Sequence, residues 1–128
     1  MGNNVRNALI FVVLSLVFTS CDRRDAQLRQ QIAGTWYLSS GVIRGVIVFV
    51  SDGSASSHLT NGTEELAFQM TWKVKDGIII STDTRASARN TTNWIAVGDV
   101  TRSEVIHVDD HQLVYSSNGR TISLSRQK

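Results

Sequence analysis

Metal-ligand residue types are concentrated in one short segment, His107-Val108-Asp109-Asp110-His111. Two imidazoles and two carboxylates could contribute to a metal site, which needs three or four converging ligands. A hairpin would bring them together only if both histidines faced the same way. A solvated Asp-Asp turn accounts for the same residues without a ligand, because aspartate favours turns. We therefore predict a turn here, and no metal site.

Residues suited to catalysis do not form a recognisable set. Glu64 and Glu65 are adjacent, and neighbouring residues on a strand point to opposite faces, so they cannot act as a pair. The sequence has no glycine-rich loop between a strand and a helix, and its serines lack a nucleophile-elbow pattern. A nucleophile, a base and an orienting group are all required for such an enzyme. We predict a protein that is not an enzyme and uses no cofactor.

Cys21 is the only cysteine in the chain, so it cannot form an intramolecular disulfide. It follows a short polar start that contains Arg6 and an apolar run, residues 8–18, broken only by Ser15. A positive start, an apolar core of about 7–15 residues and small residues at the exit are typical of a secretory signal. The run is shorter than the roughly 20 residues that span a bilayer. Residues 1–20 are thus predicted to be a cleaved signal peptide.

The segment Phe18-Thr19-Ser20-Cys21 resembles the lipobox of bacterial lipoproteins, although Phe18 stands where leucine is usual. The resemblance implies cleavage before Cys21 and acyl chains such as palmitate on that residue. It also implies a lipid anchor in the bacterial cell envelope, facing the periplasm or the cell exterior, with the choice of membrane open. The alternative is an ordinary signal peptide with a chance cysteine at the cut.

The remaining chain is the size of one domain. Removing 20 of the 128 residues leaves 108, enough for a single core. Only Arg6 among the 13 basic residues precedes Cys21, so 12 basic residues face 11 acidic ones and the net charge is +1. This small charge gives no reason to expect a nucleic-acid partner. We assign residues 21–33 to a tether and short helix and residues 34–128 to a β-domain.

Valine, isoleucine, threonine and aromatic runs separated by Asn-Gly and Asp-Gly pairs predict strands and hairpins after residue 33. The nine predicted strands are Thr35–Ser40, Gly45–Val50, Ser54–Thr60, Glu64–Lys75, Ile78–Asp83, Asn93–Val97, Val100–Val108, Gln112–Ser117 and Arg120–Arg126. Short connections make neighbours antiparallel, and closure into a barrel removes exposed edges. We predict an all-β, up-and-down barrel of about eight strands, preceded by the cleaved signal and a short helix.

The strand over Glu64–Lys75 shows the clearest alternation of apolar and polar residues. Period two places Phe68, Met70 and Trp72 on the inner face and Gln69 and Thr71 in solvent. Residues 84–93, with Arg85 and Arg89, are predicted to form a loop that could contact a partner.

Gly34-Thr35-Trp36 resembles the start of lipocalins and of bacterial lipocalin-like domains. Three later segments resemble hairpins of the same domains: Phe49–Ser54, Trp72–Ile80 and Leu113–Arg126. The resemblance as a whole is spread over residues 32–126. Longer lipocalin signatures are missing. The resemblance implies that Trp36 plugs the closed end of the barrel and that Arg126, from the last strand, lies over its ring.

Six bulky residues could line a ligand cavity: Phe49, Phe68, Met70, Trp72, Trp94 and Tyr115. They could equally fill the barrel, since eight strands enclose either packed side chains or one small ligand. Any cavity is expected to include Met70 and Trp72, away from the plug at Trp36. We predict a membrane-anchored, non-enzymatic lipocalin-like lipoprotein that binds a small apolar ligand or an envelope protein. The alternative is a structural or inhibitory interaction module that acts through its loops.

Overall fold

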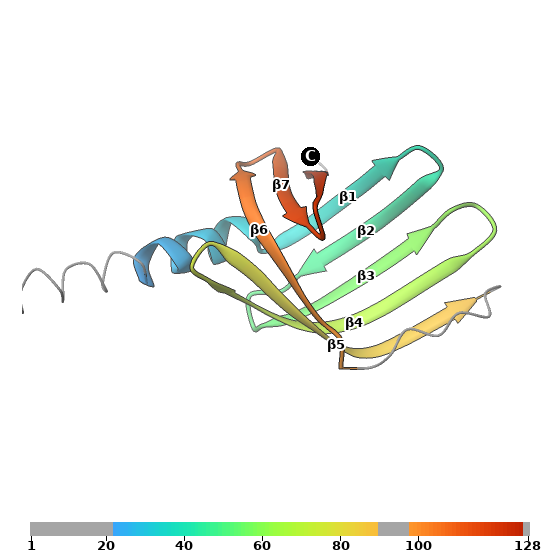
Figure 1. The fold of residues 1–128 in the computed structure, drawn as a ribbon, viewed down its shortest axis with the longest axis horizontal. Helices are drawn as coiled ribbons and strands as arrows, with labels where there is room; N and C mark the ends of the chain where they lie inside the picture. Colours follow the sequence, from blue (N-terminus) through green and yellow to red (C-terminus); the bar gives the residue numbers. More distant parts are fainter. Residues whose placement is uncertain (1–21, 90–97, 127–128) are drawn as a thin grey trace, which may run out of the picture.

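The computed structural model describes residues 22–89 and 98–126, and within them the chain forms a closed antiparallel barrel (Figure 1). One helix, residues 22–32, leads into the first strand. The eight strands are β1 (Gly34–Ser40), β2 (Ile43–Phe49), β3 (Ser54–Thr60), β4 (Glu65–Lys75), β5 (Ile78–Arg89), β6 (Val100–Val108), β7 (Gln112–Ser117) and β8 (Arg120–Arg126). Each pairs with its neighbour in the chain, and β8 pairs with β1. The predicted up-and-down barrel is confirmed.

The predicted bounds of β3, β6, β7 and β8 agree with the structure. The predicted starts of β1 and β4 are each wrong by one residue, and their ends agree. β2 begins at Ile43, earlier than predicted, because Gly41 and Val42 already form the turn that precedes it. The remaining predicted strand, Asn93–Val97, lies outside the described residues. Within the described ranges, no helix has the length and hydropathy needed to cross a membrane.

Two of the predicted hairpin turns contain consecutive residues with positive φ. Asp76 and Gly77 have φ of 53° and 74°, and Asn118 and Gly119 have φ of 50° and 74°. Asn and Asp tolerate this conformation better than other non-glycine residues, which is why these pairs suit two-residue hairpins. The β4–β5 and β7–β8 connections are therefore two-residue turns, and each turn fixes which residues of its two strands pair.

The predicted loop over residues 84–93 is wrong for its first part, because β5 continues to Arg89. β4 is long, and its first half would present unpaired backbone groups if β5 ended at Asp83. A bulge keeps the pairing: Met70 lies opposite Asp83 but Gln69 lies opposite Arg85, so Thr84 is the extra residue. Residues 90–93 lie outside the described residues.

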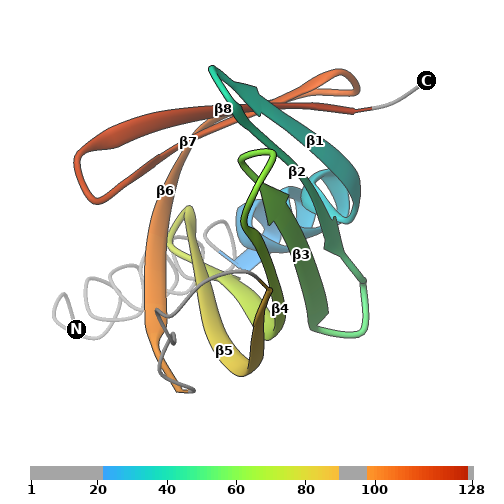
Figure 2. The same cartoon turned by 90° about the vertical axis from the view of Figure 1, so that its right-hand side faces the viewer.

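The barrel closes through a short contact between β1 and β8. The register pairs Trp36 with Arg126 and Tyr37 with Ser125, whereas β1 pairs with β2 along its whole length. Figure 2 looks at the molecule from the end where the β1–β2 and β3–β4 hairpins lie, and it shows β8 crossing β1 near the top of the view. Closure at this seam is thus local, and it occurs at the residues predicted to form the plug.

The hydrophobic core lies at the end of the barrel next to the helix. Its buried members are Ile32, Trp36, Phe49, Ala55, Trp72, Ile79, Leu113 and Leu124. On β4, Trp72 is buried whereas Gln69, Thr71 and Lys73 are exposed, so the predicted alternation of this strand is confirmed there. We call this end, covered by the helix and Trp36, the closed end. The opposite end, with the β1–β2 and β3–β4 hairpin tips, is the open end.

Candidate functional site

The closed end is organised around the indole of Trp36, which is 0 % exposed. Its Nε1 donates a hydrogen bond of 2.7 Å to the carbonyl of Ile32, the last residue of the helix. The Arg126 guanidinium carbon lies 4.3 Å from the ring centroid, and its Nη2 donates to the Gln31 carbonyl at 2.5 Å. A guanidinium over an indole face gains about 0.5–2 kcal/mol. Trp36 and Arg126 therefore join the helix, the first strand and the last strand.

The helix presents one face to the barrel, with residues at helical spacing: Asp25, Leu28, Arg29 and Ile32. The Asp25 carboxylate accepts hydrogen bonds from the backbone N–H groups of Asp76 and Gly77, at 2.8 and 3.0 Å. These two donors belong to the β4–β5 turn. Sequence analysis missed Asp25, although its spacing from Leu28 and Ile32 shows that it shares their face.

Arg29 makes a second link between the helix and the barrel. Its Nη2 donates to the Ser51 carbonyl in the β2–β3 turn at 2.9 Å, and its guanidinium carbon lies 5.5 Å from the Trp72 ring centroid. Sequence analysis missed this residue too, because the turn that it contacts lies 22 residues away along the chain. The helix is held at several points along its length, so it covers the closed end as a fixed element.

Two of the six predicted cavity residues, Phe49 and Trp72, lie in the closed-end core instead. Their ring centroids are 5.0 Å apart at an interplanar angle of 63°, and Trp72 Nε1 donates to the Val50 carbonyl at 2.8 Å. The expectation that Trp72 lies away from the plug is wrong. Ala55 on β3 lies opposite Phe49 on β2 and opposite Met70 on β4. Trp72 follows Met70 by two residues, so it lies beside the β2–β3 turn, at the closed end.

The buried side chains of the inner face lie at the closed end, whereas those nearer the open end are half-buried. Met70 and Tyr115, two further members of the predicted cavity set, are half-buried and pack against the core. Phe68 is also half-buried, but it lies one step further out and outside the core cluster, as do Leu59 and Leu66. Trp94, the remaining member, lies outside the described residues. Apolar side chains beyond the core therefore remain accessible on the inner face.

An apolar hollow of about 270 Å³ lies between the two hairpin tips at the open end. Its lining residues are Val42, Ile43, Leu59, Thr60, Asn61, Glu64 and Leu66. Val42 is 75 % exposed and Ile43 43 % exposed. Leu59 packs against Gly45, where an added Cβ would clash with Leu59 Cδ2. Only glycine at position 45 leaves room for the leucine in this place.

Polar groups also face the interior near its middle. Asp83 shares the inner face of β5 with Ile79 and Ser81, opposite Met70. Burial, and after it the neighbouring Asp99 carboxylate, raise the pKa of Asp83. Burial also raises the pKa of the Tyr115 phenol. The interior wall is therefore apolar with a few acidic or hydroxyl groups.

A second hollow, of about 380 Å³, lies on the outer face of β2–β5. Val46, Val48, His58, Ala67 and Arg85 contribute to its lining. His58 Nε2 lies 4.0 Å from Glu65 Oε2 on this face. Phe68 and Ala86 also border this hollow. By the alternation of β4, the side chain of Ala67 points to the outer face and that of Phe68 to the inner face, so these strands offer matched positions for testing which face is occupied.

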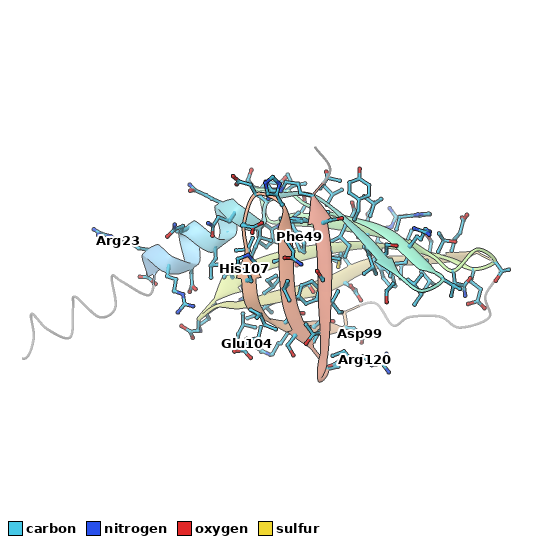
Figure 3. All side chains as sticks on the ribbon, turned by 90° about the horizontal axis from the view of Figure 1, so that it is seen from above. Arg23, Phe49, Asp99, Glu104, His107 and Arg120 are labelled. Carbon is cyan, nitrogen blue, oxygen red and sulfur yellow. The ribbon has the colours of Figure 1, made fainter. Side chains whose placement is uncertain are left out.

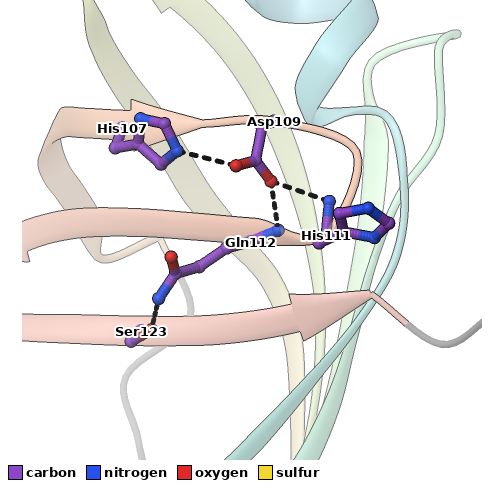
Figure 4. Close-up of polar contacts among 5 residues, drawn as sticks. All are labelled: His107, Asp109, His111, Gln112 and Ser123. Carbon is purple, nitrogen blue, oxygen red and sulfur yellow. Dashed lines mark hydrogen bonds and ion pairs between the residues drawn. The ribbon is translucent and has the colours of Figure 1, made fainter.

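The segment His107–His111 forms a hairpin turn around one carboxylate (Figure 4). Asp109 Oδ2 lies 2.9 Å from His107 Nε2, and Asp109 Oδ1 accepts from the backbone N–H groups of His111 and Gln112, both at 2.7 Å. The ring of His111 points away from this carboxylate in the figure. Among the described residues, no group of three or more candidate side chains could hold a metal ion.

The chain matches no protein-family model, and no curated protein matches it.

Replacing Trp36 tests the organisation of the closed end. Trp36→Ala is expected to lower the free energy of unfolding by about 3–5 kcal/mol, because it empties a large buried site. Trp36→Phe keeps most of the ring but removes the donor to the Ile32 carbonyl, at a cost of about 1–3 kcal/mol. Chemical denaturation measures both, and Val42→Ala at an exposed position serves as the control. A loss below about 1 kcal/mol for Trp36→Ala would contradict this arrangement.

The hydrogen bonds to Asp109 predict its titration. The His107 hydrogen bond, followed by those from the His111 and Gln112 backbone, lowers the pKa of Asp109 from 3.8 to about 2. Because the folded pKa lies below the unfolded value, the stabilising contribution is present above pH 3.8 and is lost as the pH falls towards 2. An NMR titration of the carboxyl carbon should show this midpoint, and His107→Ala should move it upwards. A midpoint at the ordinary value would exclude the hydrogen bonds.

Proposed function

We propose that the protein is a lipid-anchored, lipocalin-like barrel that binds a small apolar ligand from its open end. The observation that carries this proposal is the change from buried to half-buried apolar side chains along the inner face. The closed end is packed, whereas Leu59, Leu66 and Phe68 keep accessible apolar surface beyond the core. Ligand sites are typically concave and mostly apolar, with a few polar groups that fix orientation.

The interior of the open half has the composition that an apolar ligand needs. Leucine and phenylalanine side chains come from β3 and β4, and the hollow at the hairpin tips adds Val42 and Ile43. Transfer of apolar surface from water gains about 25 cal/mol per Å², so covering these side chains favours binding. Asp83 and Tyr115, nearer the core, would meet the inner end of a ligand and favour one that carries a hydrogen-bonding group there.

The anchor is proposed from the sequence around Cys21, which precedes the described helix directly. One acyl chain gives only marginal membrane binding, whereas two or more give stable attachment. A multiply acylated cysteine would hold the barrel on a bacterial envelope membrane, where amphiphilic and apolar molecules are abundant. The proposal includes no enzymatic activity and no cofactor.

A second function is favoured by the exposure of the hairpin tips. Val42 and Ile43 lie in or next to the β1–β2 turn and expose large apolar side chains to solvent. Such residues can anchor a protein partner, in line with a structural or inhibitory interaction module. Organic extraction of the purified protein followed by mass spectrometry separates the two functions. A stoichiometric apolar molecule favours ligand binding, whereas an empty barrel that retains a protein in pull-down favours the module.

Filling the interior should block ligand binding. Ala86 lies opposite Phe68 on the inner face of β5, and Ala67 is the neighbour of Phe68 on the outer face of β4. Ala86→Trp should abolish the fluorescence enhancement of N-phenyl-1-naphthylamine, whereas Ala67→Trp should leave it intact. Circular dichroism confirms that both variants fold. Loss of the signal with Ala67→Trp alone would place the probe in the outer hollow, and no signal with the unaltered protein would exclude the cavity.

Removing the cysteine tests the anchor. Cys21→Ser should abolish incorporation of radiolabelled palmitate and leave the protein soluble or as an uncut precursor, because the acyl chains supply the membrane affinity. Metabolic labelling and membrane fractionation measure these outcomes, and Ser20→Ala, which keeps a small residue before the cut, is the matched control. A correctly processed Cys21→Ser protein that stays in the membrane fraction would rule out lipidation.

A further inference from the structure

We infer that the membrane holding the anchor lies against the closed end of the barrel, so that the open end faces away from the bilayer. The inference rests on the proposed lipidation of Cys21 and adds an orientation to it. It follows from the way in which the helix after Cys21 is attached to the rest of the domain.

The chain between the anchor and the first barrel contact is very short. The helix begins at residue 22, and Asp25 already accepts hydrogen bonds from the β4–β5 turn. Three residues lie between Cys21 and Asp25, and from the start of the helix at residue 22 to Asp25 the rise is about 4.5 Å at about 1.5 Å per residue. A link of this length cannot let the barrel turn freely above the membrane, as a long flexible linker would.

The helix is also fixed to the barrel along the rest of its length. Arg29 holds the β2–β3 turn and covers Trp72, and Ile32 is buried against Trp36. The Ala33 backbone N–H then donates to the Arg29 carbonyl at 3.0 Å, and β1 begins at Gly34. Within residues 22–34 there is no extended spacer, so the helix and the barrel move together.

The two ends of the molecule lie far apart along its long axis. Figure 3 places Arg23, near the start of the helix, at one end of the molecule, and Figure 1 places the β1–β2 and β3–β4 hairpin tips at the other. β4 alone runs from Glu65 near the tips to Lys75 near the helix, which is about 33 Å at about 3.3 Å per residue. An anchor at the start of the helix therefore leaves the open end tens of ångströms from the lipid.

This orientation restricts how a ligand reaches the barrel. With the mouth turned away from the bilayer, an apolar molecule cannot pass sideways from the membrane that holds the anchor into the interior. It must arrive from the aqueous compartment or from another protein or membrane opposite. The exposed Val42 and Ile43 then face that compartment and not the anchoring lipid.

Energy transfer to the lipid surface tests the orientation. Cys21 is the only cysteine. In the proposed lipoprotein its thiol carries lipid, so an introduced cysteine is the sole site for a maleimide dye. Lys75→Cys marks the closed end and Val42→Cys the open end, and both positions are exposed. The full mature lipoprotein is inserted into phosphatidylcholine vesicles that contain a headgroup-labelled acceptor. Transfer should be several-fold higher from position 75 than from position 42.

The helix contacts supply the matched control. Asp25→Ala combined with Arg29→Ala removes the links to the β4–β5 and β2–β3 turns, and it should bring the two transfer efficiencies closer together. Equal transfer from the two positions with the unaltered helix, or higher transfer from position 42, would overturn the orientation while leaving the anchor intact. Failure of the purified protein to float with vesicles would instead overturn the anchor itself, and the orientation with it.

Discussion

The stacking of Arg126 on Trp36 is the contact on which the rest of the structure depends. β1 and β8 pair only at Trp36–Arg126 and Tyr37–Ser125, so the barrel is closed at the residues that also form its plug. The indole hydrogen bond to Ile32 then fixes the end of the helix to the same point. One aromatic side chain thus joins the strand seam, the helix and the core, and a single substitution there affects all three.

Closure at one end produces two unlike halves. The helix and every described strand except β6 contribute a side chain to the buried core around Trp36, and this core is confined to this half. Beyond it, β1 and β8 no longer pair, and the inner apolar side chains of β3 and β4 have no opposing layer in the core cluster. Packing at native density needs atoms on both sides of each side chain. The apolar inner surface of the second half therefore stays partly accessible.

The helix extends this asymmetry beyond the barrel. Its inward face combines Leu28 and Ile32, which pack, with Asp25 and Arg29, which bind the backbone of two turns. Backbone donors in a tight turn have few other partners, so a carboxylate that reaches them fixes the helix in position as well as in direction. The same contacts that cover the core also determine where the chain before residue 22 leaves the domain.

Local residue patterns were enough to predict where the eight described strands lie, apart from the start of β2 and the second part of β5, and to predict their antiparallel order. Asp76-Gly77 and Asn118-Gly119 adopt positive φ at both positions, and the alternation of β4 selects its inner face, because both properties depend on neighbouring residues alone. The position of Arg126 over Trp36 followed from family resemblance and not from spacing. The lipid anchor and the ligand remain predictions.

Tertiary structure decided what depends on register and on distant partners. Trp72 belongs to the closed end because the β3–β4 pairing sets Met70 opposite Ala55, and no local pattern contains that offset. β5 continues past Thr84 because β4 needs a partner there, although its own sequence resembles a loop. The roles of Asp25 and Arg29 likewise arise only when the helix meets turns that are far away in the chain. A sequence alone determines which face of a strand is apolar; only the closed barrel determines which end of that face stays open.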